Sequence, residues 1–176
     1  MRIVGGIYKG RVLCPFEKIG VRPTSDMTRE SLFNILQFRI QGSRFLDLFA
    51  GTGAVGIEAL SRGANEVVLN DFSKESILLI KKNLEKLGIK NGVKVTSFDA
   101  VSLLASGRET FDIIFIDPPY QSDLGKKVLD VLSNSLTDDG IAIFESDKPF
   151  VGEVHGLNLY DQRRYGKAHL TFFKKG

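Results

Sequence analysis

The sequence has little of what several common classes of protein depend on. Its 176 residues include no tryptophan, one cysteine (Cys14) and two histidines. A single cysteine excludes an internal disulfide, and with two histidines it leaves too few soft ligands for a Cys/His zinc site. Apolar runs such as 113–116 are interrupted by charge within a few residues, well short of the roughly 20 residues that a membrane span needs. We therefore expect neither a metal nor a membrane.

The remaining composition is typical of one soluble domain. Hydrophobic residues make up 43% and charged residues 26%, which argues against intrinsic disorder. Met1 is followed directly by Arg2, with no apolar segment and no small-residue cleavage site of a signal peptide. We expect a cytoplasmic protein with a single domain over residues 1–176, in which 1–22 form an extension and 23–176 the core.

The net charge of +3 conceals a strong asymmetry. Residues 1–22 carry a net charge of +4 and residues 162–176 a net charge of +5, so the 139 residues between them sum to −6. Two basic ends on an acidic body are typical of solvated tails, and also of a surface that binds a polyanion. Charge alone leaves both interpretations open.

Apolar runs bounded by turn residues predict an α/β fold. We predict strands at 45–49, 67–70, 93–98, 111–116 and 141–144. Helices are expected at 28–40, at 54–62, between Ser73 and Gly88, and at 123–136. Nearly continuous apolar strands that alternate with helices indicate a doubly wound, parallel sheet.

The two ends of the chain depart from this alternation. Two further strands, 157–160 and 170–173, have no long helix between them, so we expect an antiparallel pair. The first 14 residues, which contain Gly5, Gly6 and Gly10, predict a short hairpin outside the sheet.

A glycine turn joins the first predicted strand to its helix. Gly51, Gly53 and Gly56 follow Asp47 in the pattern G-x-G-x-x-G. Glycines at the carboxyl end of a strand let a ligand approach the backbone closely, although purely structural turns use the same pattern.

Acidic residues end the next two strands and favour a ligand at this edge. Asp71 lies 20 residues after Gly51, where a carboxylate can accept hydrogen bonds from ribose hydroxyls. Asp99 and Ala100 follow the third strand, where a second acid can meet an adenine amino group. These positions predict an adenosine-containing cofactor, either a dinucleotide or S-adenosylmethionine.

The fourth strand separates these two cofactors. It is followed by Asp117, Pro118, Pro119 and Tyr120, and the two prolines hold a rigid loop at the point where substrates bind. The Asp117 carboxylate and a proline carbonyl are neighbouring acceptors for the two N–H donors of a planar exocyclic amine. Tyr120 can stack on the base that carries the amine.

Taken together, this ordered set resembles the class I, S-adenosylmethionine-dependent amino methyltransferases. The chain is most similar to the RsmD-type bacterial enzymes, which methylate the N2 amine of a guanine in 16S ribosomal RNA, and residues 2–11 and 22–36 resemble that family's amino-terminal motifs. The resemblance implies a Rossmann-like fold with a mostly parallel seven-stranded sheet, helices on both faces, an antiparallel C-terminal strand pair and a small N-terminal hairpin. It also implies a monomer that acts on 16S rRNA within the small ribosomal subunit or an assembly intermediate.

The resemblance and the motifs together predict three groups of site residues. Those expected to bind S-adenosylmethionine are Thr24, Arg29, Asp47, Gly51, Gly53, Asp71, Phe72, Asp99 and Ala100. Those expected in catalysis are Asp117, Pro118, Pro119 and Tyr120. Those expected to contact RNA are Arg2, Lys9, Arg11, Arg163, Arg164 and Lys167.

Rival interpretations account for part of the pattern. A nicotinamide-dependent dehydrogenase explains the glycines and Asp71 but gives residues 117–120 no role. A protein glutamine methyltransferase usually has Asn where this chain has Asp117, and it has no need of basic ends. A DNA adenine N6 methyltransferase shares the amine chemistry, and a non-catalytic RNA-binding module explains the charge but not the cofactor residues.

Overall fold

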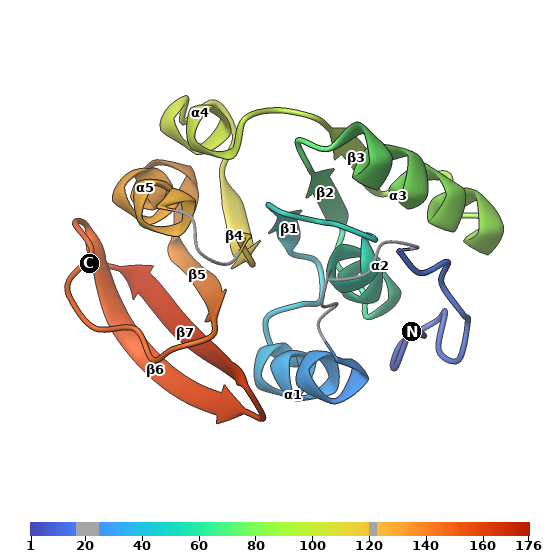
Figure 1. The fold of residues 1–176 in the computed structure, drawn as a ribbon, viewed down its shortest axis with the longest axis horizontal. Coiled ribbons are helices and arrows are strands. Elements are labelled where there is room, and N and C mark those ends of the chain that lie inside the picture. The colour runs from blue at the N-terminus through green and yellow to red at the C-terminus, as the bar shows by residue number, and fades with distance from the viewer. Residues whose placement is uncertain (17–24, 120–122) are drawn as a thin grey trace.

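The computed structural model describes residues 1–16, 25–119 and 123–176. Within these ranges, seven strands form one sheet in the order β3-β2-β1-β4-β5-β7-β6 (Figure 1). Their bounds are β1 Arg44–Asp47, β2 Glu66–Asn70, β3 Val93–Thr96, β4 Phe111–Ile116, β5 Leu136–Ser146, β6 Leu157–Tyr165 and β7 Ala168–Lys175. Strands β1 to β5 run parallel, whereas β7 pairs antiparallel with both β5 and β6. The predicted class I methyltransferase topology, with its C-terminal antiparallel pair, is confirmed.

Helices cover both faces of the sheet. They are α1 Asp26–Leu36, α2 Ala54–Ser61, α3 Lys74–Leu87, α4 Ala100–Ala105 and α5 Leu124–Val131. Neighbouring residues of β1 point to opposite faces: Phe45 stacks on Phe33 of α1, and Leu46 packs in a second core with Leu104 of α4 and Leu129 of α5. Helices α1, α2 and α3 therefore cover one face, and α4 and α5 cover the other (Figure 1).

The strand order reverses between β1 and β4. From β1 the chain proceeds through α2 to β2 on one side, while β4 lies on the other side of β1. In open α/β sheets, ligands bind in the crevice beyond the carboxyl ends of the strands at such a reversal. The glycine turn after β1 and the Asp117 loop after β4 flank this point.

The N-terminal residues form the predicted hairpin outside the sheet. Arg2 and Val12 make an antiparallel bridge, and the Ile3 N–H donates to the Arg11 carbonyl (2.9 Å). Polar contacts fasten this hairpin to α2, since the buried Glu58 accepts hydrogen bonds from the backbone of Val4 and Gly5. These hydrogen bonds therefore attach the hairpin to helix α2 of the core.

Several predicted boundaries are wrong. Helix α1 ends at Leu36 instead of residue 40, and β3 ends at Thr96 instead of residue 98. Strand β5 begins at Leu136, which was expected to end a helix. The first part of this strand contains the exposed residues Asp138 and Asp139, so its sequence lacks the apolar pattern of a buried strand. The six-residue helix α4 is too short to show helical periodicity.

Within residues 1–16, 25–119 and 123–176, no helix has both the length and the apolar character to cross a bilayer.

Candidate cofactor and catalytic site

The glycine turn after β1 is shaped by residues without side chains. Gly53 precedes α2 with φ of 80°, a left-handed conformation that other residues adopt only with strain. Gly56, in the first turn of α2, permits close packing on the sheet, because an added Cβ would lie 2.2 Å from the Leu69 side chain. Gly51 and Gly53 thus form the turn itself, and Gly56 brings the helix close to β2.

Asp71 reaches from the end of β2 to this turn. Its Oδ2 accepts a hydrogen bond from the Gly51 N–H (2.8 Å), and its Oδ1 accepts one from the Ser73 N–H (2.9 Å). A carboxylate has about four acceptor positions, so Asp71 keeps capacity for hydroxyl donors. The two predicted residues Gly51 and Asp71 are in direct contact.

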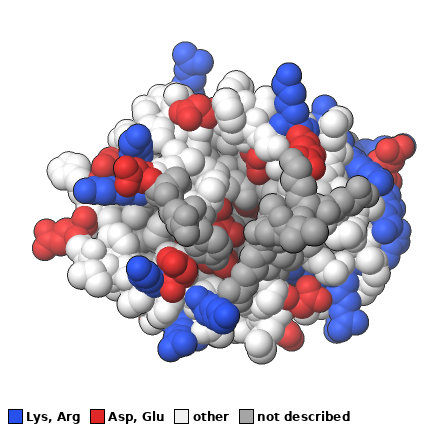
Figure 2. All heavy atoms as spheres, viewed as in Figure 1, with Lys and Arg blue, Asp and Glu red and all other residues white. Residues whose placement is uncertain are grey.

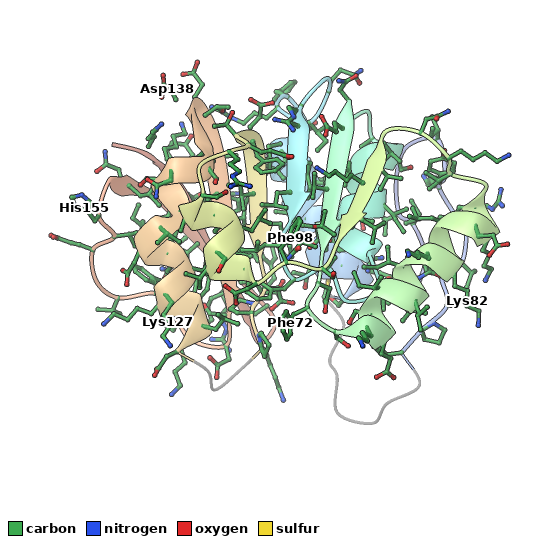
Figure 3. All side chains as sticks on the ribbon, turned by 90° about the horizontal axis from the view of Figure 1, so that it is seen from above. Phe72, Lys82, Phe98, Lys127, Asp138 and His155 are labelled. Carbon is green, nitrogen blue, oxygen red and sulfur yellow. The ribbon has the colours of Figure 1, made fainter. Side chains whose placement is uncertain are left out.

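Two exposed aromatic side chains flank the ends of β2 and β3. Phe72 is 78% exposed and Phe98 is 56% exposed, and both lie between the α3 side and the α4–α5 side of the molecule (Figure 3). Exposed large apolar groups next to a polar crevice are typical of a binding surface. Phe72 was predicted, whereas Phe98 was missed.

Asn70 holds the Phe98 loop in place and was also missed. This buried amide accepts hydrogen bonds from the Phe98 N–H (3.0 Å) and the Thr96 hydroxyl (2.8 Å), and it donates to the carbonyls of Phe98 and Leu48. The sequence signal for Asn70 was a polar residue directly after the apolar run 67–69. The structure shows that this last position of β2 is buried.

Asp99 begins α4 as its N-terminal cap. Its Oδ1 accepts a hydrogen bond from the Ser102 N–H (2.9 Å), and this bond lowers the pKa of the exposed carboxyl below its ordinary value. Ala100, which follows, is buried. Asp99 is therefore ionised at neutral pH and exposed beside Phe98.

Three acids lie on one face of the sheet, at the ends of neighbouring strands. Asp47 ends β1 and is buried, Asp117 follows β4 and is partly exposed, and the buried Glu145 lies near the end of β5. Burial raises the pKa of Asp47 to about 7. Burial, and then the charges of Glu145 and Asp47, raise the pKa of Asp117 well above its ordinary value. Sequence analysis missed Glu145.

Asp47→Asn should change how folding stability depends on pH. The pKa of Asp47 is about 7 in the folded protein and 3.8 ordinarily. The folded protein therefore holds this proton more tightly than the unfolded chain does, and this stabilisation is fully present below pH 3.8. It is lost as the pH rises through the folded-state pKa of about 7. Asparagine does not titrate, and its oxygen can still accept the hydrogen bond that the Gly56 N–H donates to Asp47 (2.9 Å).

The measurement is thermal unfolding of both proteins at several pH values. Between about pH 5 and pH 8, the melting temperature of Asp47→Asn should rise relative to that of the wild type. Parallel curves for the two proteins would contradict the shifted pKa of Asp47.

Pro118 is fixed by its packing. It is buried, and Gly125 at the start of α5 lies against it, since an added Cβ there would sit 3.2 Å from Pro118 Cγ and 3.1 Å from the Phe144 ring. Pro119 is exposed. The rigid loop predicted from the two prolines is thus held by α5, and Tyr120 lies outside the described residues.

Arg29 has protein partners on the hairpin side. Its guanidinium is fully buried and donates to Asp26 Oδ1 (2.8 Å) and to the Arg2 carbonyl, and its Nε lies 4.0 Å from Glu58 Oε2. These contacts join α1, α2 and the hairpin. The predicted contact of Arg29 with the cofactor stays a prediction, and Thr24 lies outside the described residues.

The predicted RNA-binding side chains are exposed and form two groups. Arg2, Lys9 and Arg11 lie on the hairpin, and Arg163, Arg164 and Lys167 lie on β6 and the turn before β7. The hairpin and the β6–β7 pair that carry these groups lie on opposite sides of the molecule (Figure 1). In the same view, Lys and Arg side chains lie around the rim, and Asp and Glu side chains lie both at the rim and toward the centre (Figure 2).

No site for a metal emerges from the described parts of the chain. Among those residues, no group of three or more His, Cys, Asp or Glu side chains has an arrangement that could hold an ion.

This arrangement matches a known family. The family model described as Conserved hypothetical protein 95 covers residues 1–174. The chain belongs to this family. Its relatives include the Escherichia coli (strain K12) protein named Ribosomal RNA small subunit methyltransferase D, 37% identical over 84% of this chain and 75% of the relative. The predicted RsmD-type membership is confirmed.

Further comparisons cover the whole chain. The Bacillus subtilis protein YlbH is 36% identical over 182 residues, which include 99% of each chain. The solved structure of yhhF from Escherichia coli superposes with a TM-score of 0.88 at 32% identity, over 99% of this chain and 97% of that one. The similarity therefore covers nearly the whole length of this chain.

Proposed function

We propose that this member of the family methylates the exocyclic N2 amine of a guanine in 16S ribosomal RNA of the small ribosomal subunit. The observation that carries the proposal is the position of Asp117 and Pro118. They follow β4 where the strand order reverses, one strand away from the glycine turn after β1. The Asp117 carboxylate and the Pro118 carbonyl match the two N–H donors of such an amine.

S-adenosylmethionine is the cofactor, and it supplies an activated methyl group when bound. The described residues fit its parts. Asp71 has acceptor positions left for ribose hydroxyls, Phe72 and Phe98 expose rings suited to an adenine face, and Asp99 is available for the adenine amine. The glycine turn leaves its backbone open to the methionine end.

The Asp117 carboxylate and the Pro118 carbonyl would act by orienting the amine. The lone pair of a guanine amine is delocalised into the ring, so hydrogen bonds to Asp117 and Pro118 favour pyramidalisation and stabilise the developing positive charge. Alignment of the nitrogen with the methyl group supplies much of the acceleration. The nitrogen becomes acidic only after methylation, so Asp117 is first an orienting acceptor and then a proton acceptor.

The basic rim supports RNA as the partner. Residues 23–161 carry a net charge of −6 and repel phosphates overall, so the hairpin and the β6–β7 turn must supply the attraction. A guanine within a helix must be turned outward to reach Asp117, which costs a few kcal/mol. We propose that these two basic groups hold a folded particle, the small subunit or an assembly intermediate, that presents one exposed guanine to a monomer of this protein in the cytoplasm. Tyr120 would stack on that guanine.

Replacing Lys9 and Arg11 together by alanine should reduce the salt dependence of binding. Both side chains are exposed on the hairpin. About two phosphate contacts should be lost, which lowers the slope of log K against log[salt] by roughly 1.4 to 1.8. Filter binding of small subunits at several salt concentrations measures the slope. An unchanged slope would mean that the hairpin charges do not contact RNA, and cofactor affinity serves as the control.

The proposed function is tested by transfer of labelled methyl groups to small subunits from a strain that lacks the gene. Naked 16S rRNA, adenine-containing DNA and total cell protein are offered in parallel. Label in N2-methylguanosine from 16S rRNA supports the proposal. Label in N6-methyladenine or in methylated glutamine overturns it in favour of the other amine substrates.

A further inference from the structure

Asn83 is a buried amide in α3 that joins two distant segments of the chain. Its Oδ1 accepts a hydrogen bond from the Cys14 N–H (2.7 Å), and its Nδ2 donates to the Thr52 carbonyl (2.9 Å) and to the Cys14 carbonyl (3.4 Å). The side chain is 0% exposed. An amide supplies both an acceptor and donors at one place, so neither a carboxylate nor an apolar group can make the same set of contacts.

The two segments that Asn83 joins also touch each other. Phe16 lies over the glycine turn, with its Cε2 3.7 Å from the position that a Cβ on Gly51 would take. At the same turn, the Thr52 hydroxyl lies 3.8 Å from Met1 Sδ. The N-terminal segment 1–16 therefore forms a wall beside the turn that receives the cofactor.

A second buried side chain fixes the other part of this segment. Glu58 accepts hydrogen bonds from the Val4 N–H (2.8 Å) and the Gly5 N–H (2.7 Å), and from the Arg62 side chain (2.8 Å). Its helix, α2, begins directly after the glycine turn. Ser61 of the same helix also accepts from the Tyr8 N–H and donates to the Gly5 carbonyl. Helices α2 and α3 thus both hold the segment, and of the two buried side chains Glu58 and Asn83, Asn83 is the one that also bonds the turn, at Thr52.

The glycine turn depends on such external bonds. Gly51 and Gly53 both have positive φ and no side chain, so their backbone is free to adopt many conformations. Among the described residues, the bonds at the turn include those of the Asp71 carboxylate at Gly51, of the Ala50 carbonyl at Gly53 and of Asn83 at Thr52, whose hydroxyl also lies against Met1 Sδ. Of the three groups Asp71, Ala50 and Asn83, Asn83 is the one that also bonds the backbone of the hairpin segment, at Cys14.

We infer that Asn83 is a positioning residue, which holds the glycine turn in the conformation that binds S-adenosylmethionine and makes cofactor affinity depend on the seating of residues 1–16. The inference rests on the cofactor assigned above. It also gives the hairpin a second role, because an RNA bound at Lys9 and Arg11 acts on the cofactor site through this amide. By linkage, the cofactor then strengthens RNA binding by the same factor.

The experiment measures the dissociation constant of S-adenosylhomocysteine by calorimetry, with the full chain well below its melting temperature. Asn83→Asp keeps the volume and an acceptor for the Cys14 N–H but loses the donor to the Thr52 carbonyl. We expect its dissociation constant to rise on the order of tenfold. The matched control is Leu87→Ala, one turn later on α3, which removes a buried side chain and should lower the melting temperature without changing the affinity.

Phe16→Ala tests the seating of the segment from the other side. It should weaken binding by itself, and combined with Asn83→Asp the loss should be smaller than the product of the two single effects, because both act through the same segment. If Asn83→Asp does not fold, Asn83→Ser provides the same comparison, since its shorter hydroxyl cannot reach both segments.

Three results would overturn the inference. The first is an unchanged dissociation constant in folded Asn83→Asp, and the second is an equal rise in Leu87→Ala. The third is a purely multiplicative loss in the double variant, which would show that the turn and the segment are independent. None of these measurements uses RNA, so their failure is distinct from a failure of the proposed methylation of guanine.

Discussion

Asp117→Ala is expected to lower turnover by about 10²–10³-fold while the protein still binds S-adenosylhomocysteine and small subunits. The magnitude is that of removing one group that stabilises charge in a transition state. Because the bonds to Asp117 strengthen as the amine becomes pyramidal, the loss should fall on kcat with KM little changed. Single-turnover methylation of small subunits, together with cofactor titrations, separates these quantities.

The controls come from the same position and the same strand. Asp117→Asn keeps one acceptor without the charge, so it should retain more turnover than Asp117→Ala. Asp112→Asn alters a carboxylate at the other end of β4, where it accepts hydrogen bonds from the Arg44 N–H (2.8 Å) and the Thr137 hydroxyl (3.2 Å). It should affect stability more than turnover. Wild-type turnover in Asp117→Ala would exclude the catalytic role.

The pH dependence of the wild type gives an independent check on Asp117. Burial and the neighbouring acids raise the pKa of Asp117, and only the ionised carboxylate carries the negative charge that stabilises the developing positive charge on the amine and can then accept its proton. Turnover should therefore fall as the pH is lowered through this raised pKa, at a higher pH than for an ordinary carboxyl. An acid limb near the ordinary value of 3.8 would contradict the burial of the group.

The parts of the fold that were predictable from sequence are those with an unambiguous pattern. Strands such as β4 are buried on both faces and read as apolar runs, and acids at strand ends stand out against them. Strand β5 was mispredicted at its start because Asp138 and Asp139, which have low strand propensity, lie within it. The strand pairs with β4 at Leu136 and, after a register shift, again from Ile141 onward.

The contacts of the buried polar residues in the helices could not be predicted from the sequence. Glu58 and Asn83 are polar residues of a kind that usually faces solvent, and their partners in the hairpin segment lie 53 or more residues and 69 residues away, respectively. No local spacing encodes such pairs, since they arise only when the hairpin docks on α2 and α3. Arg29 illustrates the same point, because the burial of its guanidinium beside Asp26 and the Arg2 carbonyl becomes visible only in the fold.

Asp71→Ala should weaken cofactor binding by about 1.5–3 kcal/mol, the usual cost of losing hydrogen bonds to a charged group. The structure adds a reason for a value near the upper end, because the same carboxylate accepts the Gly51 N–H and so shapes the glycine turn. Asp71→Asn keeps an acceptor for Gly51 and should lose less, whereas Asp99→Ala removes an exposed cap of α4 and leaves the turn intact. Calorimetric titration of the three variants with S-adenosylhomocysteine ranks these effects. A folded Asp71→Ala protein with wild-type affinity would remove the ribose contact from the site, and with it the argument that the acid after β2 faces the cofactor.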